Sequence, residues 1–171
     1  MEKINQKGFT LIELILYIGI ASFMLLVVFL FVSQILEVRT KGQVIAEVEQ
    51  QGYWAVQVIT QAIRNSKAPI NLPAVASSGP SLSLTMADGT KNPTAFSLSS
   101  GAILMSESGG STIPLTNSNI TISNLNFQNL TANGTKGNIK FSFDVNYNSQ
   151  AGSGYEFKYL KTFYATASVR Y

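Results

Sequence analysis

Hydrophobic residues form one continuous run near the start of the chain and recur periodically after it. No charged residue occurs from Leu14 to Leu36. As a helix rising about 1.5 Å per residue, this run is long enough to cross a hydrocarbon layer roughly 30 Å thick. The pattern predicts a membrane-spanning helix over residues 9–36. An ordinary secretory signal is not favoured, because the run is too long and no Ala-x-Ala type cleavage site follows it near 33–37.

Beyond this run, apolar residues return at the spacing of an amphipathic helix. The stripe consists of Val38, Ile45, Val48, Gly52, Ala55, Ile59, Ala62 and Ile63. This spacing predicts an amphipathic helix over 37–68, continuous with the span, so that one helix runs from about Thr10 to about Asn65 and stops before Pro69. A coiled-coil stalk is less favoured, because only about three heptads are sustained. We expect Trp54, beside the stripe, to lie in the core or, alternatively, between head domains, and we expect that Tyr53 could be exposed.

From residue 74 onward the period of the pattern changes. Residues 74–81 are small and rich in Pro and Gly, which indicates a linker out of the helix. Alternating runs then predict short strands at 81–86, 94–99, 102–106, 120–127, 139–146 and 157–170. In the last of these we expect Phe157, Tyr159, Phe163 and Tyr164 to be core residues. The predicted fold is α+β, with a long N-terminal helix packed on a mostly antiparallel sheet that belongs to a head of residues 69–171.

Composition limits the chemistry that this chain can perform. The chain has 171 residues, with no cysteine and no histidine. With neither cysteine nor histidine, zinc sites are excluded from this chain alone, and the missing histidine also excludes His-based acid–base catalysis. No nucleophile elbow, phosphate-binding loop or calcium loop is present, and Asp88-Gly89 is predicted to be a turn. We therefore predict no enzyme activity, no cofactor and no metal. The acids beyond the span are expected to be mostly solvated surface: Glu37, Glu47, Glu49, Asp88, Glu107, Asp144 and Glu156.

One short motif stands at the entrance to the apolar run. Residues 7–13 read Lys-Gly-Phe-Thr-Leu-Ile-Glu, which places the carboxylate of Glu13 inside a membrane-length segment. A carboxylate there costs a few kcal/mol on insertion scales, so it implies a partner and a function. The simpler alternative is that Glu13, near the end of the span, only reaches the headgroups. These residues resemble the processing and methylation site of type IV prepilins.

The resemblance implies a role for each residue of the motif. A membrane peptidase that also methylates would cut after Gly8 and methylate the new amino terminus at Phe9, which defines residues 1–8 as a leader. Lys3 and Lys7 would hold that leader on the cytoplasmic side, with the carboxyl-terminal head outside. Glu13 of an incoming subunit would pair with the Phe9 amine of its neighbour, because each charge alone is costly in hydrocarbon and the pair is less so. The resemblance also implies the pilin fold, a single-pass location in the cytoplasmic (inner) membrane, and later a cell-surface or periplasmic filament.

Three functions are compatible with these patterns. The first is a structural subunit of a type IV pilus or of a secretion pseudopilus, with other pilin or pseudopilin subunits and assembly platform proteins as its partners. A minor or initiating subunit is favoured, because the membrane half lacks the proline, and the head the cysteine pair, of many major pilins. The second is a head that binds DNA or a surface. The third is a membrane-anchored surface protein that never assembles, for which the leader would stay attached and Glu13→Ala would be harmless.

The second function would need a basic face on the head. Its candidate residues are Lys136, Lys140, Lys158, Lys161 and Arg170. Asp144 and Glu156 fall in the same region, which favours an ordinary solvated face of mixed charge. The formal net charge of +3 is too small to indicate nucleic acid by itself.

Overall fold

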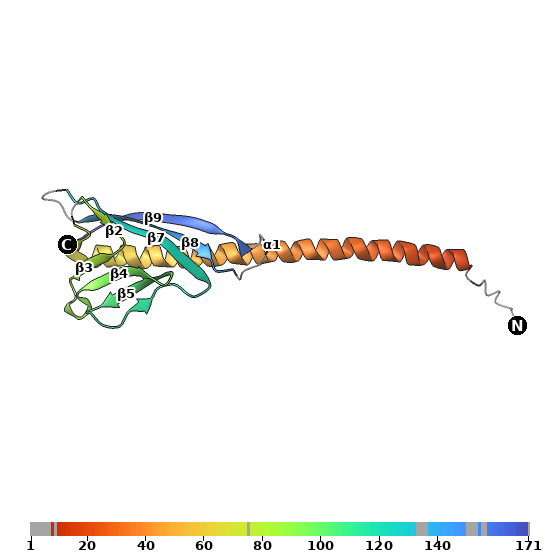
Figure 1. The fold of residues 1–171 in the computed structure, drawn as a ribbon, viewed down its shortest axis with the longest axis horizontal. Coiled ribbons are helices and arrows are strands. Elements are labelled where there is room, and N and C mark those ends of the chain that lie inside the picture. The colour runs from red at the N-terminus through yellow and green to blue at the C-terminus, as the bar shows by residue number, and fades with distance from the viewer. Residues whose placement is uncertain are drawn as a thin grey trace. The chain divides into compact units, whose positions relative to one another are not determined.

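The structure is a computed structural model that describes residues 8, 10–74, 76–132, 137–149, 154 and 157–170. It contains two compact units, Met1–Thr40 and Lys41–Tyr171. The long helix α1 (Leu11–Asn65) supplies the helical residues of the first unit and the first element of the second (Figure 1). The prediction of one helix from about Thr10 to about Asn65 is therefore confirmed.

In the first unit, α1 is long and apolar enough to cross a membrane. Its serine hydroxyls are satisfied within the helix. Ser22 Oγ donates to the carbonyl of Ile18 at 2.8 Å, and Ser33 Oγ donates to that of Leu30 at 2.8 Å. Such bonds remove the cost of placing an unpaired hydroxyl in hydrocarbon. The large apolar side chains of this segment are exposed, from Leu11 to Leu36.

The second unit combines the rest of α1 with two antiparallel sheets. One sheet has the strand order β1-β3-β4-β5-β6 and the other β2-β7-β8-β9. The strands are β1 (Ser66–Leu72), β2 (Ser78–Gly79), β3 (Leu82–Met86), β4 (Thr94–Ser99), β5 (Ala102–Glu107), β6 (Ile113–Pro114), β7 (Ile120–Asn129), β8 (Asn138–Tyr147) and β9 (Leu160–Ser168). The sheets meet where the N–H of Ile122 donates to the carbonyl of Gly101 at 2.7 Å. The α+β class and the antiparallel pairing are confirmed, but the expectation of a single sheet is wrong.

The segment after the helix differs from the prediction. A linker was expected at 74–81, with the first strand after it. Instead β1 follows α1 at once, and the expected linker contains β2. The hydroxyl of Ser66 donates to the carbonyl of Ile63 at 2.7 Å and so satisfies one of the last carbonyls of the helix.

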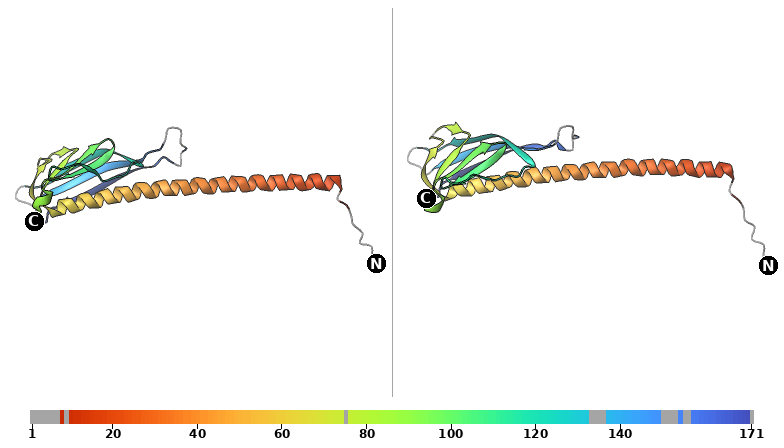
Figure 2. Two further views of the ribbon diagram at one scale, coloured as in Figure 1. Left: turned by 90° about the horizontal axis from the view of Figure 1, so that it is seen from below. Right: turned by 60° about the horizontal axis from the view of Figure 1, so that its bottom comes forward.

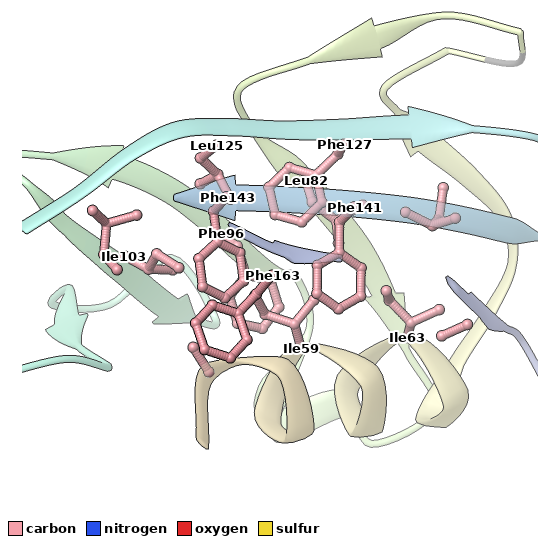
Figure 3. Close-up of a cluster of buried hydrophobic side chains, with 14 of the residues drawn as sticks. Ile59, Ile63, Leu82, Phe96, Ile103, Leu125, Phe127, Phe141, Phe143 and Phe163 are labelled. Atoms are coloured by element: carbon pink, nitrogen blue, oxygen red, sulfur yellow. The ribbon is translucent and has the colours of Figure 1, made fainter. Parts of the chain in front are cut away.

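The core lies between α1 and the inner faces of both sheets. The buried residues of the helix are Val44, Val48, Gly52, Ala55, Ile59 and Ile63. Figure 3 shows Ile59 and Ile63 extending from α1 toward Phe141 and Phe163. The predicted stripe was therefore right at its centre. It missed Val44, included the partly buried Ile45 and Ala62, and began at Val38, which lies in the first unit and is exposed.

Two aromatic residues predicted for the core are instead exposed. Tyr164 is 75% exposed, because alternation along β9 places it on the sheet face opposite Phe163. Trp54 is 54% exposed, because it falls outside the arc of α1 that faces the sheets, although its neighbour Ala55 is buried. The expected exposure of Tyr53 is confirmed, at 55%. Phe157 and Tyr159 are partly buried.

A buried asparagine holds the ends of three strands together. Asn129, at the end of β7, is fully buried. Its Nδ2 donates to the carbonyl of Pro73 at 2.9 Å, and its Oδ1 accepts from the N–H of Thr131 at 3.1 Å. Its backbone exchanges hydrogen bonds with Ser77 and Ala76, beside β2. Asn129 therefore joins the end of β7 to the segment that follows β1 and to the start of β2.

Candidate functional site

The motif at the amino-terminal end of the span coincides with the start of α1. Thr10 precedes the first helical residue, and its Oγ1 accepts from the N–H of Glu13 at 3.4 Å. Its carbonyl accepts from the N–H of Leu14 at 3.2 Å, which closes the first helical turn. Thr10 is thus the N-cap, and Glu13 holds the N3 position of a Thr-x-x-Glu sequence typical of a capping box. An acidic group in the first turn is also favoured by the helix dipole.

Gly8 and Glu13 of the processing motif are accessible. Gly8 is exposed, and a Cβ built on it would meet no atom within 4 Å. Glu13 is exposed on the first turn of α1. Phe9, Lys3 and Lys7 lie outside the described residues. The predicted pairing of Glu13 with the Phe9 amine therefore stays a prediction.

Glu13 stands at one end of a large exposed apolar surface. From Leu14 to Val32 the large apolar side chains of α1 are between 47% and 73% exposed. Soluble monomeric proteins rarely expose so extensive an apolar surface, which marks a membrane or protein interaction site. The arrangement is one carboxylate at the start of a helix that needs an apolar environment over the next several turns.

The candidate basic residues of the head do not share one direction. Lys140 on β8 pairs in register with Thr166 and is exposed on the outer sheet face. Lys161 on β9 pairs in register with Val145, so it points to the opposite, inner face. There its Nζ donates to Glu49 Oε1 at 2.7 Å.

The environment of Lys161 is that of a structural residue. Its Nζ also lies 5.4 Å from the ring centroids of Tyr53 and Phe163. The hydrogen bond to Glu49 raises the pKa of Lys161 above its ordinary value. This ion pair joins β9 to α1, with the Lys161 side chain 31% exposed.

The other three candidates are scattered. Lys158 is exposed in the turn before β9. Arg170, beyond β9, donates its N–H to the carbonyl of Arg64 at 3.3 Å, and both arginines line a cleft of about 400 Å³ at the end of α1. Lys136 lies outside the described residues.

Two acids that the sequence indicated as solvated surface instead join α1 to the sheets. Glu49 bonds to Lys161 on β9, and Glu47 accepts a short hydrogen bond from Asn117 Nδ2 in the turn before β7.

A third acid, Asp144, accepts from Thr162 Oγ1 at 2.6 Å and from Asn124 Nδ2 at 2.7 Å on the outer sheet face. These two hydrogen bonds lower the pKa of Asp144 below its ordinary value of 3.8. Sequence spacing alone gives no signal for these long-range contacts.

The described residues contain no group of three or more acids that could hold a metal ion. Asp88, predicted to sit in a turn, caps the 3-10 helix η1 (Gly89–Lys91) and accepts from the N–H of Thr90 at 2.9 Å and from its Oγ1 at 2.7 Å. The bonds from Thr90 lower the pKa of Asp88. The predicted turn is therefore confirmed, and its carboxylate is used within that turn.

Comparison with known proteins identifies the amino-terminal site. Residues 3–29 match the family model of the prokaryotic N-terminal methylation motif. No curated protein and no solved structure matches the chain. The match confirms the resemblance found in residues 7–13: the chain carries a type IV pilin-like prepilin signal. Its helix-plus-antiparallel-sheet architecture is consistent with the pilin fold.

Proposed function

We propose that this protein is a structural subunit of a type IV pilus-like filament or pseudopilus, and that it serves as a minor or initiating subunit. It is processed after Gly8, methylated at the Phe9 amine and assembled through Glu13. The leader is residues 1–8, and residues 9–36 anchor the subunit in the cytoplasmic membrane before they enter the filament core. The carboxyl-terminal head lies outside. The partners are a prepilin peptidase, assembly platform proteins and other pilin or pseudopilin subunits.

The observation that carries this proposal is the combination at the start of α1. A match to the N-terminal methylation motif covers residues 3–29, and the same segment exposes a long apolar surface with a carboxylate at its first turn. A carboxylate next to hydrocarbon costs roughly 2–3 kcal/mol on insertion scales, and an ammonium partner offsets part of that cost. A neighbouring subunit that supplies its amino terminus would therefore draw Glu13 into register.

A DNA-binding head is supported less well. Of its candidate residues, Lys161 is bonded to Glu49 and Lys140 lies on the opposite face of the sheet. A binding surface of clustered lysines would require them to project together.

The test of the proposal uses the capping geometry of Glu13. A capping box accepts Gln as well as Glu, so Glu13→Gln keeps the helix start and removes only the charge. We expect Glu13→Gln to insert in the membrane as the wild type does and to lose filament incorporation by tenfold or more. Glu37→Gln makes the same change at an exposed position on the same helix beyond the span, and we expect it to assemble normally. Normal incorporation of Glu13→Gln would limit Glu13 to helix capping and would contradict assembly through its charge.

A further inference from the structure

Between positions 43 and 61 the exposed residues of α1 carry no charge. Figure 2 shows the strands on one side of this part of α1, with the opposite side uncovered. The exposed residues from position 43 to position 61 are Gln43, Ala46, Gln50, Tyr53, Trp54, Gln57 and Gln61. A helix face that remains in water normally carries charged residues. This face has amides and aromatic rings in their place.

This stretch of helix does contain two acids, but both are directed to other parts of the head. Glu47 is directed to Asn117, and Glu49 is directed to Lys161. Both acids are only partly exposed. The two charged residues between positions 43 and 61 therefore contact Asn117 and Lys161, and the exposed residues of this stretch are uncharged.

The outward residues follow the spacing of a helix–helix contact. Gln43, Gln50 and Gln57 are seven residues apart, and Trp54 and Gln61 are also seven apart and fall between them. From Gln50 to Gln61 the steps are four, three and four residues, which is the repeat by which two parallel helices pack side by side. Seven residues before Trp54 this register is occupied by Glu47, which is directed to Asn117, and seven residues after Gln57 it is occupied by the exposed Arg64. We call these five residues the glutamine seam.

The chemistry of the seam suits an identical partner. A glutamine side chain both donates and accepts hydrogen bonds, so a row of glutamines can pair with a copy of itself. A row of glutamates or lysines would repel its own copy. Trp54, about half exposed, supplies the large apolar side chain that commonly anchors protein interfaces. Copies anchored in one membrane through the same amino-terminal segment also leave it with the same chain direction, which permits a parallel contact.

We propose that the glutamine seam packs in parallel against the glutamine seam of a second copy of this chain. The inference rests on the proposed function only in taking the protein to be anchored in a membrane with its head on one side. It adds a contact that belongs to the head and does not involve Glu13. The contact would pair subunits before or during incorporation into a filament.

The absence of native cysteine allows a direct test in the full-length protein. Gln50→Cys and Gln57→Cys each place one thiol on the seam, and Thr166→Cys places one on the exposed outer face of β9. Membranes containing each variant are treated with a mild oxidant, and the disulfide-linked dimer is measured on non-reducing gels. We expect at least tenfold more dimer from the seam variants than from Thr166→Cys. Equal yields would overturn the proposal, as would a disulfide to a different protein without self-linkage.

A charge substitution separates a specific contact from random collision. Gln50→Glu, combined with Gln57→Cys as the reporter, puts one carboxylate on each seam. Glutamate has nearly the helix propensity of glutamine, so the head should keep its unfolding midpoint. Like charges facing each other at an interface are strongly unfavourable, and we expect the dimer to fall tenfold or more. Asn126→Asp makes the matched amide-to-acid change on the sheet face and should leave the yield unchanged. If Gln50→Glu leaves the dimer yield undiminished, the proposed seam contact is wrong.

The proposal and the proposed function can fail independently. If the protein is cleaved after Gly8 and incorporated through Glu13 but shows no seam-specific dimer, the proposed function stands and the proposed seam contact is wrong. If the protein is never cleaved but still forms the charge-sensitive dimer, the filament role is wrong and the proposed seam contact stands.

Discussion

Replacement of Gly52 by alanine should destabilise the head, although alanine is the better helix former. A Cβ built on Gly52 would lie 2.2 Å from Cζ of Phe163, and 2.3 and 2.7 Å from its two Cε atoms. The ring cannot easily retreat. It stacks on Phe143 with ring centroids 5.7 Å apart, it meets the edge of Tyr53 at 5.4 Å, and it is only 5% exposed.

The magnitude follows from two opposing effects. Alanine in place of glycine inside a helix is favourable by about 1 kcal/mol. Forcing an extra group into a packed core costs typically about 1–3 kcal/mol and sometimes more. Because the overlap involves three ring atoms of a confined aromatic side chain, the cost belongs at about 3 kcal/mol, at the upper end of that range. We therefore expect the free energy of unfolding to fall by about 2 kcal/mol.

The assay is thermal unfolding of the full chain in detergent, followed by near-ultraviolet circular dichroism of the aromatic core. Gly42→Ala is the matched control, because Gly42 lies on the same helix, is exposed and has nothing within 4 Å of the added Cβ. Its free energy of unfolding should stay the same or rise by up to about 1 kcal/mol. The double variant Gly52→Ala/Phe163→Leu should regain part of the loss caused by the alanine. Equal stability of Gly52→Ala and Gly42→Ala would refute the packing argument.

Two further predictions concern buried and hydrogen-bonded polar groups. Asn129→Ala should lower the free energy of unfolding in urea by about 2–3 kcal/mol, because the Pro73 carbonyl and the Thr131 N–H lose their partner; a loss below about 0.5 kcal/mol would contradict this role. The lowered pKa of Asp144 means that its contribution is present above its ordinary value of 3.8 and is lost as pH falls through the folded-state value. Asp144→Asn should therefore flatten the acid side of the stability–pH curve while Thr162 stays in place, and an unchanged slope below pH 4 would argue against the prediction.

Local pattern accounts for most of the fold that the sequence predicted. The strand predicted over 94–99 agrees with β4, and α1 ends at the predicted Asn65, because alternation and helical spacing are local properties. Strand β1 was missed because Pro69 indicated only a stop. As an edge strand of its sheet, β1 tolerates a proline that would break the ladder of a central strand. The division into two sheets depends on which distant strands pair, and spacing within a strand carries no information about that.

The candidate sites also differ in how far the sequence alone identifies them. The processing motif at residues 7–13 is a contiguous stretch, and its residues are recognisable from the order of amino acids alone. The glutamine seam is not, because its significance depends on which side of α1 the sheets leave uncovered. The contacts of Glu47 and Glu49 join residues 70 and 112 positions apart. Contacts of that range are set by the fold as a whole and by no local spacing.

The most direct test of the filament role is the intact mass of the protein recovered from cells that contain a prepilin peptidase. We predict a chain that begins at Phe9 and is heavier by one methyl group than the unmodified chain from that residue. A full-length chain beginning at Met1 would contradict processing. It would leave a membrane-anchored surface protein as the better account of this sequence.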